Sequence, residues 1–190
     1  GKVVDTLLTS NMAFGDPRET FSGYEFSSDE RFVVLTTASE GLYRHSFYAN
    51  FFVYDFESDE DARSITNFSL GKQRLAQLSP AGDKVAFVRE NNIFISDLAT
   101  GAEIQVTTDG VTNAIINGAT DWVYEEEFGD DQGLFWNGDG SRLAYLKFDE
   151  SNVREFHMPV YGSLYPDPYT FKYPKAGEDN SEVSVHIYTL

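Results

Sequence analysis

An apolar residue, a polar turn and a run of strand-forming residues occupy residues 78–88, with the sequence Leu78-Ser79-Pro80-Ala81-Gly82-Asp83-Lys84-Val85-Ala86-Phe87-Val88. Two related runs flank it, Phe26-Ser27-Ser28-Asp29-Glu30-Arg31-Phe32-Val33-Val34-Leu35 and Trp136-Asn137-Gly138-Asp139-Gly140-Ser141-Arg142-Leu143-Ala144-Tyr145-Leu146. Ser, Asn, Pro, Asp and Gly favour the turn because they tolerate or preset its backbone dihedrals. The Val, Leu, Phe and Tyr residues that follow suit a buried strand. The three runs therefore predict three β-hairpins.

The spacing of the hairpins indicates a repeat. Their turns begin at Ser27, Ser79 and Asn137, which lie 52 and 58 residues apart. Further strand-like runs follow each hairpin, at 51–55, at 92–97 and 103–107, and at 183–190. A period near 50 residues with about four strands per unit is typical of a β-propeller. We expect an all-β fold of about three four-stranded antiparallel blades from a larger propeller, whose open arc leaves apolar blade faces uncovered. A β-sandwich with coincidental hairpin spacing is the alternative.

Composition excludes several functions. The chain has 190 residues, a formal net charge of −17 and no cysteine. Its surface repels nucleic-acid phosphates and anionic lipid, so we expect no nucleic-acid partner and favour cationic ones. Disulfides, thiol redox chemistry and cysteine-based zinc sites are excluded, and no apolar run is long enough to span a bilayer.

Two segments interrupt the repeat. Residues 110–135 contain a run of acidic residues, and residues 149–182 contain four prolines and several tyrosines. The second segment is too long for an ordinary hairpin loop, so we interpret it as an insertion or a long excursion between strands. It is a candidate dimerisation element.

The acidic run Asp121-Trp122-Val123-Tyr124-Glu125-Glu126-Glu127-Phe128 places three consecutive carboxylates between aromatic residues. On a short helix, successive side chains diverge by about 100°, so at most two carboxylates converge on one point. Adjacent carboxylates repel, and a ligand ammonium relieves that repulsion because its three donors need several acceptors. The alternative is a solvated acidic turn.

The second candidate is Tyr43-Arg44-His45-Ser46. A guanidinium holds a substrate carbonyl through its fixed fork of donors, whereas in an acidic chain it also serves as a structural ion pair. His45 has no neighbouring Cys or second His, so we expect no metal site. The chain has no Gly-x-Ser-x-Gly elbow and no phosphate-binding glycine loop, and we assign no catalytic residue and no cofactor.

The acidic run resembles the Asp-Trp-Val-Tyr-Glu-Glu-Glu motif of the dipeptidyl peptidase IV family, serine peptidases of the prolyl oligopeptidase clan. Tyr43-Arg44-His45-Ser46 resembles that family's arginine-bearing strand, and Tyr173-Pro174-Lys175-Ala176-Gly177 its Tyr-Pro-Lys-Ala-Gly segment. The segments Lys147-Phe148-Asp149-Glu150 and Leu164-Tyr165-Pro166 are similar to bacterial members. The resemblance covers nearly the whole chain in the right order.

The resemblance implies an N-terminal propeller, often eight-bladed, followed by an α/β-hydrolase domain that carries the catalytic triad. Residues 1–190 then form an incomplete propeller domain, and the hydrolase domain is absent from the chain. Family members remove dipeptides from free N-termini, with Pro or Ala at the second position. By position in the motif, Glu126 and Glu127 bind the substrate α-ammonium, and Arg44 meets the substrate carbonyl region.

Two other interpretations of the function remain open. A non-catalytic relative keeps the propeller as a protein-binding module, and a TolB-like propeller scaffold explains the repeats without the glutamates. For the peptidase, the expected partners are peptides with a free N-terminus, the hydrolase domain of the same protein, and a second copy in a homodimer. The family and the absence of cysteine favour a periplasmic or cell-surface location.

Overall fold

The three predicted hairpins share one turn geometry in the computed structural model, which describes residues 5–162 and 164–190. The first turn residue of each donates its N–H to the carbonyl oxygen five residues later over 2.8–3.0 Å, and the pairs are Ser27 with Phe32, Ser79 with Lys84, and Asn137 with Arg142. The fourth turn residue adopts a left-handed backbone in each hairpin, at Glu30, Gly82 and Gly140. The prediction of three hairpins is confirmed.

Each hairpin forms the inner part of a four-stranded antiparallel sheet, so the predicted all-β, propeller-type fold is confirmed. The first sheet contains β1 (Gly23–Phe26), β2 (Phe32–Gly41), β3 (Phe47–Asp55) and β4 (Arg63–Ser64). The second contains β5 (Arg74–Leu78), β6 (Lys84–Arg89), β7 (Asn92–Asp97) and β8 (Glu103–Gln105). The third contains β10 (Leu134–Trp136), β11 (Arg142–Asp149) and β14 (Glu182–Thr189), with β9 (Ile115–Asn117) pairing with the end of β11.

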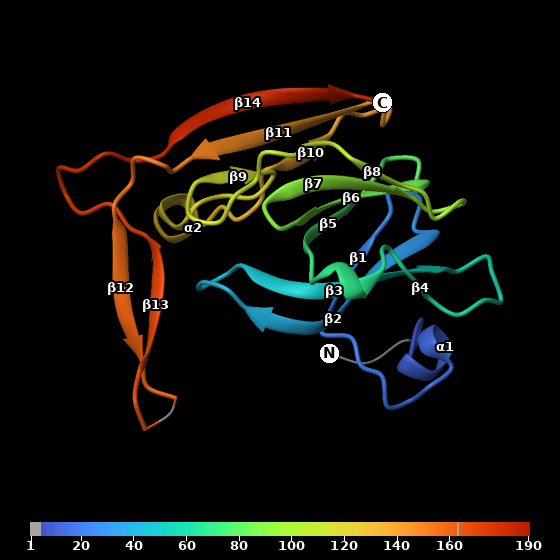
Figure 1. The fold of residues 1–190 in the computed structure, drawn as a ribbon. Coiled ribbons are helices and arrows are strands. Elements are labelled where there is room, and N and C mark those ends of the chain that lie inside the picture. Colours follow the sequence, from blue (N-terminus) through green and yellow to red (C-terminus); the bar gives the residue numbers. More distant parts are fainter. Residues whose placement is uncertain (1–4, 163) are drawn as a thin grey trace.

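The sheets pack face to face, with the second between the other two (Figure 1). Along β6, Val85 and Phe87 point into the core shared with the first sheet, whereas Ala86 and Val88 point into the core shared with the third. Successive side chains of a strand point to opposite faces. A strand buried on both faces therefore needs an unbroken apolar run, which residues 85–88 supply.

The segment 149–182 leaves the third sheet between β11 and β14 and returns as a separate hairpin of β12 (Glu155–Val160) and β13 (Asp167–Lys172). This hairpin projects away from the three sheets (Figure 1). The predicted excursion between strands is therefore a two-stranded arm. The remaining elements are α1 (Ser10–Phe14), the 3-10 turn η1 (Phe68–Leu70) and α2 (Trp122–Phe128).

The third sheet carries apolar side chains on a face that no element of the described chain covers. Val185 and Ile187 on β14 are 71% and 65% exposed. This agrees with the expectation that an open arc of blades leaves blade faces uncovered. Within the part of the chain that the structure describes, no helix has the length and apolar character needed to cross a membrane.

Candidate functional site

Helix α2 begins and ends at residues suited to those positions. The side chain of Asp121 caps the first turn by accepting the Tyr124 N–H at 3.0 Å, and its second oxygen accepts the Ser181 hydroxyl at 2.6 Å. Gly129 ends the helix in a left-handed conformation, with φ of 69°. Asp and Gly are favoured at these two positions. The acidic run is thus a helix of seven residues with both ends defined.

Aromatic packing fixes the orientation of α2. The Trp122 ring lies 4.6 Å from Tyr173, next to the β12–β13 arm, and the Tyr124 ring lies 4.9 Å from the buried Phe148 of the third sheet. Such contacts stabilise a pair beyond the burial of its area. The aromatic residues that frame the acidic run therefore hold the helix on two sides.

The three glutamates of α2 occupy three different environments. Glu125 is 1% exposed, the Glu126 side chain is 25% exposed, and Glu127 is exposed to solvent. Adjacent side chains on a helix point about 100° apart, so only one of the three consecutive glutamates points into the protein. The carboxylates that reach solvent are Glu126 and Glu127.

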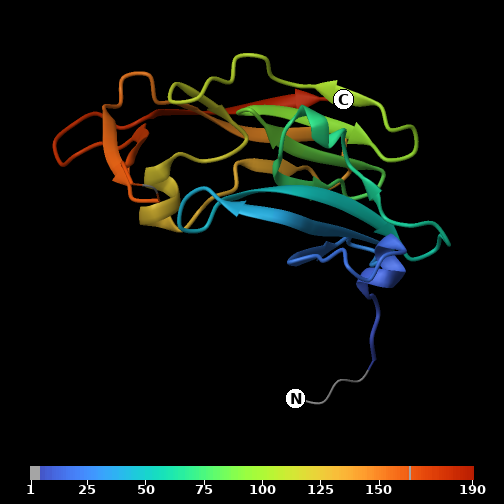
Figure 2. The same ribbon diagram turned by 60° about the horizontal axis from the view of Figure 1, so that its bottom comes forward.

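Arg44 meets Glu126 across 82 residues of sequence. It lies in the turn between β2 and β3, and its Nε donates to Glu126 Oε2 at 2.8 Å and to Oε1 at 3.0 Å. The hydrogen bond from Arg44 lowers the pKa of Glu126 below its ordinary value, and the same bond raises the pKa of Arg44. Both groups are therefore ionised at neutral pH. Figure 2 shows α2 beside this turn of the first sheet.

Glu127 makes no hydrogen bond or ion pair with any residue between 5 and 162 or between 164 and 190. Arg44, Glu126 and Glu127 together carry one positive and two negative charges. The cluster thus has a net charge of minus one, which suits a ligand with a single positive charge. The structure brings Arg44 and Glu126 into contact, and Glu127 follows Glu126 on α2.

Glu125 faces the opposite way and holds the backbone of the Arg44 turn. Its Oε1 accepts the His45 N–H at 2.6 Å and the Ser46 N–H at 2.9 Å. The turn is closed by the Leu42 N–H, which donates to the Ser46 carbonyl at 2.9 Å. No sequence signal pointed to this contact, because three consecutive glutamates cannot be told apart until the phase of the helix is known.

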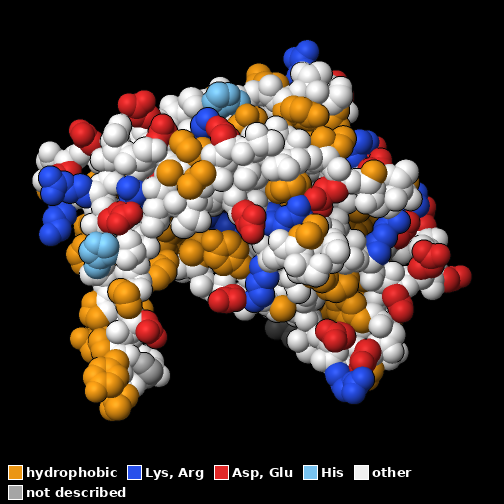
Figure 3. Space-filling view, in the orientation of Figure 1, with side chains coloured by type: hydrophobic (Ala, Val, Ile, Leu, Met, Phe, Trp, Pro, Cys, Tyr) orange, Lys and Arg blue, Asp and Glu red, His pale blue; other side chains and the backbone are white. Residues whose placement is uncertain are grey.

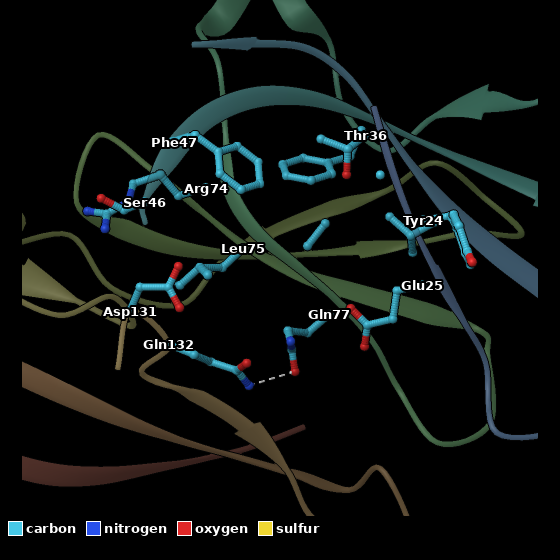
Figure 4. A pocket seen from close by; sticks show the side chains of 14 residues that line it. Tyr24, Glu25, Thr36, Ser46, Phe47, Arg74, Leu75, Gln77, Asp131 and Gln132 are labelled. Carbon is cyan, nitrogen blue, oxygen red and sulfur yellow. Dashed lines mark hydrogen bonds between the residues drawn. The ribbon is translucent and has the colours of Figure 1, made fainter. Parts of the chain in front are cut away.

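The Arg44 turn contributes to two cavities. One, of about 270 Å³, opens between the first and second sheets and is lined by Glu25, Ser46, Arg74, Asp131 and Gln132, among others (Figure 4). The other, of about 430 Å³, is lined by the whole turn from Tyr43 to Ser46. Space for a ligand is therefore present next to the turn.

Two buried charged residues near the turn escaped the sequence analysis. Arg74 on β5 is 4% exposed, and burial lowers the pKa of its guanidinium. Glu150, directly after β11, is 6% exposed; burial and the nearby Asp121 raise its pKa to about 7. Arg74 lies in no recognisable motif, and Glu150 was noted only as the end of the segment Lys147-Phe148-Asp149-Glu150, with no signal that it is buried. In the described ranges, no three His, Cys, Asp or Glu side chains cluster as a metal site.

Comparison with known proteins agrees with this architecture. Residues 27–190 match the family described as the dipeptidyl peptidase IV (DPP IV) N-terminal region. Over 86% of the chain, the sequence is 36% identical to dipeptidyl aminopeptidase B of Saccharomyces cerevisiae, and over 83% it is 37% identical to the probable dipeptidyl peptidase 4 of Aspergillus fumigatus. The whole chain superposes on the crystal structure of Porphyromonas gingivalis dipeptidyl peptidase 4, with 46% identity and a TM-score of 0.90.

The chain is much shorter than these proteins. It spans 20% and 21% of the two fungal relatives and 27% of the bacterial chain. The family match covers helix α2, the Arg44 turn and every strand of the three sheets except β1. On this evidence the chain belongs to the dipeptidyl peptidase IV N-terminal region family.

Proposed function

We propose that this chain is the substrate-recognition part of a serine exopeptidase that removes Xaa-Pro and Xaa-Ala dipeptides from free N-termini. The observation that carries the proposal is the Arg44–Glu126 ion pair beside the unpaired Glu127. The names of the relatives, dipeptidyl peptidases of fungi and a bacterium, support the reaction class.

Glu126 and Glu127 bind the substrate α-ammonium in this proposal. An ammonium has three donors, and two carboxylates offer more acceptor positions than Arg44 occupies. The bond from Arg44 keeps Glu126 ionised. Binding of one ammonium brings the net charge of the cluster to zero, whereas a blocked N-terminus leaves the cluster with its net charge of minus one and Glu127 without a cation.

Arg44 orients the carbonyl of the substrate's N-terminal residue. Its Nε is used by Glu126, while its two Nη groups make no hydrogen bond with any described residue. A guanidinium carries five N–H donors in a fixed fork. The same side chain therefore serves both the carboxylate and a substrate carbonyl.

An ammonium anchor at a fixed place also defines where a peptide is cut. We propose that a serine nucleophile lies two residues away from the anchor, in an α/β-hydrolase domain of the whole protein. The anchor then selects dipeptide release over other cleavages. A periplasmic or cell-surface location suits this activity.

The test uses the whole protein and two Xaa-Pro peptides that differ only in N-terminal acetylation. Dipeptide release from the free peptide alone is the expected result. Release from both peptides retains a peptidase but removes the role assigned to Glu126 and Glu127. Release from neither favours the alternative of a non-catalytic, propeller-type binding module.

The β12–β13 arm favours a second role in association with another protein chain. Its end exposes apolar side chains, including Met158, Val160, Tyr161 and Leu164. They form an apolar surface at the end of the projection (Figure 3). We propose that this surface contacts a second copy of the same protein in a homodimer.

A further inference from the structure

Helix α2 holds the turn that carries Arg44 at two points. Glu126 contacts the Arg44 side chain, and Glu125 contacts the backbone of the next two residues. The contacts join segments about 80 residues apart in sequence. The backbone contact fixes the position of the main chain next to Arg44, and the side-chain contact fixes the position of the Arg44 guanidinium.

The two backbone donors share a single oxygen of Glu125. Oε1 accepts both N–H groups, at 2.6 and 2.9 Å, and Oε2 is buried without a hydrogen-bond partner among the described residues. A charged oxygen is a stronger acceptor than a neutral one, and it accepts several donors. The buried guanidinium of Arg74 is a nearby positive charge: burial lowers the pKa of Arg74, and Glu125 opposes that shift.

Glu125 does not bind substrate directly in this arrangement. Its side chain is 1% exposed, and its occupied oxygen points at backbone N–H groups. We infer that Glu125 is a positioning residue: it seats the Arg44 turn on α2 so that the guanidinium and the Glu126–Glu127 pair face one substrate N-terminus. This inference rests on the proposed function and extends it to a residue that does not touch the substrate.

The decisive experiment is a double-mutant cycle in the whole protein, with kcat/KM measured on a free Xaa-Pro peptide. Glu125→Ala alone is expected to lower kcat/KM by about 10- to 100-fold, because misplacing a binding group costs that much. In an Arg44→Ala background, the same substitution is expected to change kcat/KM by no more than about twofold. The effects of the two substitutions on kcat/KM are then non-additive, as expected if Glu125 acts through Arg44.

Hydrogen exchange of the His45 and Ser46 amides supplies a readout that does not depend on activity. Glu125→Ala is expected to accelerate exchange at both amides, whereas Arg44→Ala leaves them protected by Glu125. If Glu125→Ala does not fold, Glu125→Gln replaces it: both N–H groups then lose their charged acceptor, and the new amide group takes the place of Oε2, which has no hydrogen-bond partner among the described residues.

Glu103→Gln is the matched control. Glu103 is a partly buried carboxylate that pairs with Arg89 at 2.7 Å in the second sheet. Its loss is expected to lower the melting temperature without changing kcat/KM or the exchange of the two amides. This separates a general loss of stability from displacement of the turn.

Three results overturn the inference. Unchanged amide exchange in the Glu125 variant shows that the carboxylate does not hold the turn. Additive losses of kcat/KM show that Glu125 acts by a route other than Arg44. If Arg44→Ala itself leaves kcat/KM unchanged, the role of Arg44 in the proposed function fails as well, so the two failures are distinguishable.

Discussion

At the scale of single residues, the three glutamates of α2 show how helix phase assigns different tasks to identical side chains. Glu125 is directed into the protein, Glu126 is matched to Arg44, and Glu127 is left unpaired. An unpaired carboxylate next to a neutralised one is the group most sensitive to the charge of a ligand. Glu127 is therefore the residue at which the ammonium proposal is most directly tested.

Glu127→Gln in the whole protein is expected to lower kcat/KM for a free Xaa-Pro peptide by about two orders of magnitude. The substitution removes a charge-assisted acceptor and places an amide donor next to the substrate ammonium. Steady-state kinetics measure the loss, and Glu60→Gln, at an exposed loop residue, is the control. Unchanged kcat/KM in a folded Glu127 variant contradicts the anchor assignment.

Glu150 makes stability depend on pH near neutrality. Its pKa is raised to about 7, so between about pH 4.5 and 7 the folded state binds a proton that the unfolded state has released. Stability therefore falls as pH rises through this range, by at most about 3 kcal/mol, since one pKa unit corresponds to about 1.4 kcal/mol. Glu150→Gln is expected to raise the melting temperature at pH 8 and to change it little at pH 4.5.

Calorimetry at the two pH values measures this effect. Glu155→Gln, at an exposed position on β12, is the control and is expected to leave the pH dependence as it is. Equal pH dependence in the Glu150 variant and the unmodified protein would show that Glu150 ionises in the folded state as it does in water.

At the scale of elements, the repeated turn allows the cost of a left-handed backbone to be distinguished from the cost of a steric clash. Gly82 and Gly140 occupy the same turn position with φ of 69° and 71°. A Cβ atom on Gly82 would lie 2.6 Å from the Phe32 ring, whereas one on Gly140 would lie 3.5 Å from its nearest neighbour, Pro80. Glu30 holds the corresponding position in the first hairpin, so the conformation itself tolerates a side chain.

Gly140→Ala is expected to cost about 1–2 kcal/mol, the penalty for a left-handed alanine. Gly82→Ala is expected to cost about 2–5 kcal/mol, because displacement of the Phe32 ring adds an overpacking term. Chemical denaturation of the two variants measures the difference. Equal losses would show that Phe32 moves aside without penalty.

The sequence could predict the elements better than their assembly. Turn residues and apolar runs are local, so the hairpins at 27, 79 and 137 were predictable from spacing. The contacts of Glu125 and the burial of Arg74 and Glu150 depend on how sheets pack, which no local pattern encodes. Arg44 and Glu126 were assigned to one substrate by family resemblance, whereas their direct contact needed the fold.

At the scale of the whole molecule, the β12–β13 arm is the part with the least internal support. It projects from the sheets, and Tyr161 and Leu164 at its end are 80% and 91% exposed. Apolar side chains grouped on one exposed projection are typical of a surface that contacts another protein. The arm thus carries the apolar surface proposed for contact with a second copy, apart from the groups on α2 and the Arg44 turn that are proposed to recognise the substrate.

A double substitution, Tyr161→Asp with Leu164→Asp, is expected to convert a dimer of the whole protein to a monomer. Two buried charges at the contact offset the apolar burial that holds it. Sedimentation equilibrium measures the mass, and Leu70→Asp, at an exposed leucine away from the arm, is the control. An unchanged mass in the arm variant contradicts the proposed contact.

The distance in sequence between Arg44 and Glu126 also sets an order of events during synthesis. The chain is made from its N-terminus, so the first sheet emerges from the ribosome while α2 does not yet exist. Joining two segments 82 residues apart costs more chain entropy than closing a local hairpin. The Arg44–Glu126 contact therefore forms only after α2 has been made, and a nascent chain that stalls before Trp122 presents Arg44 without its partner Glu126.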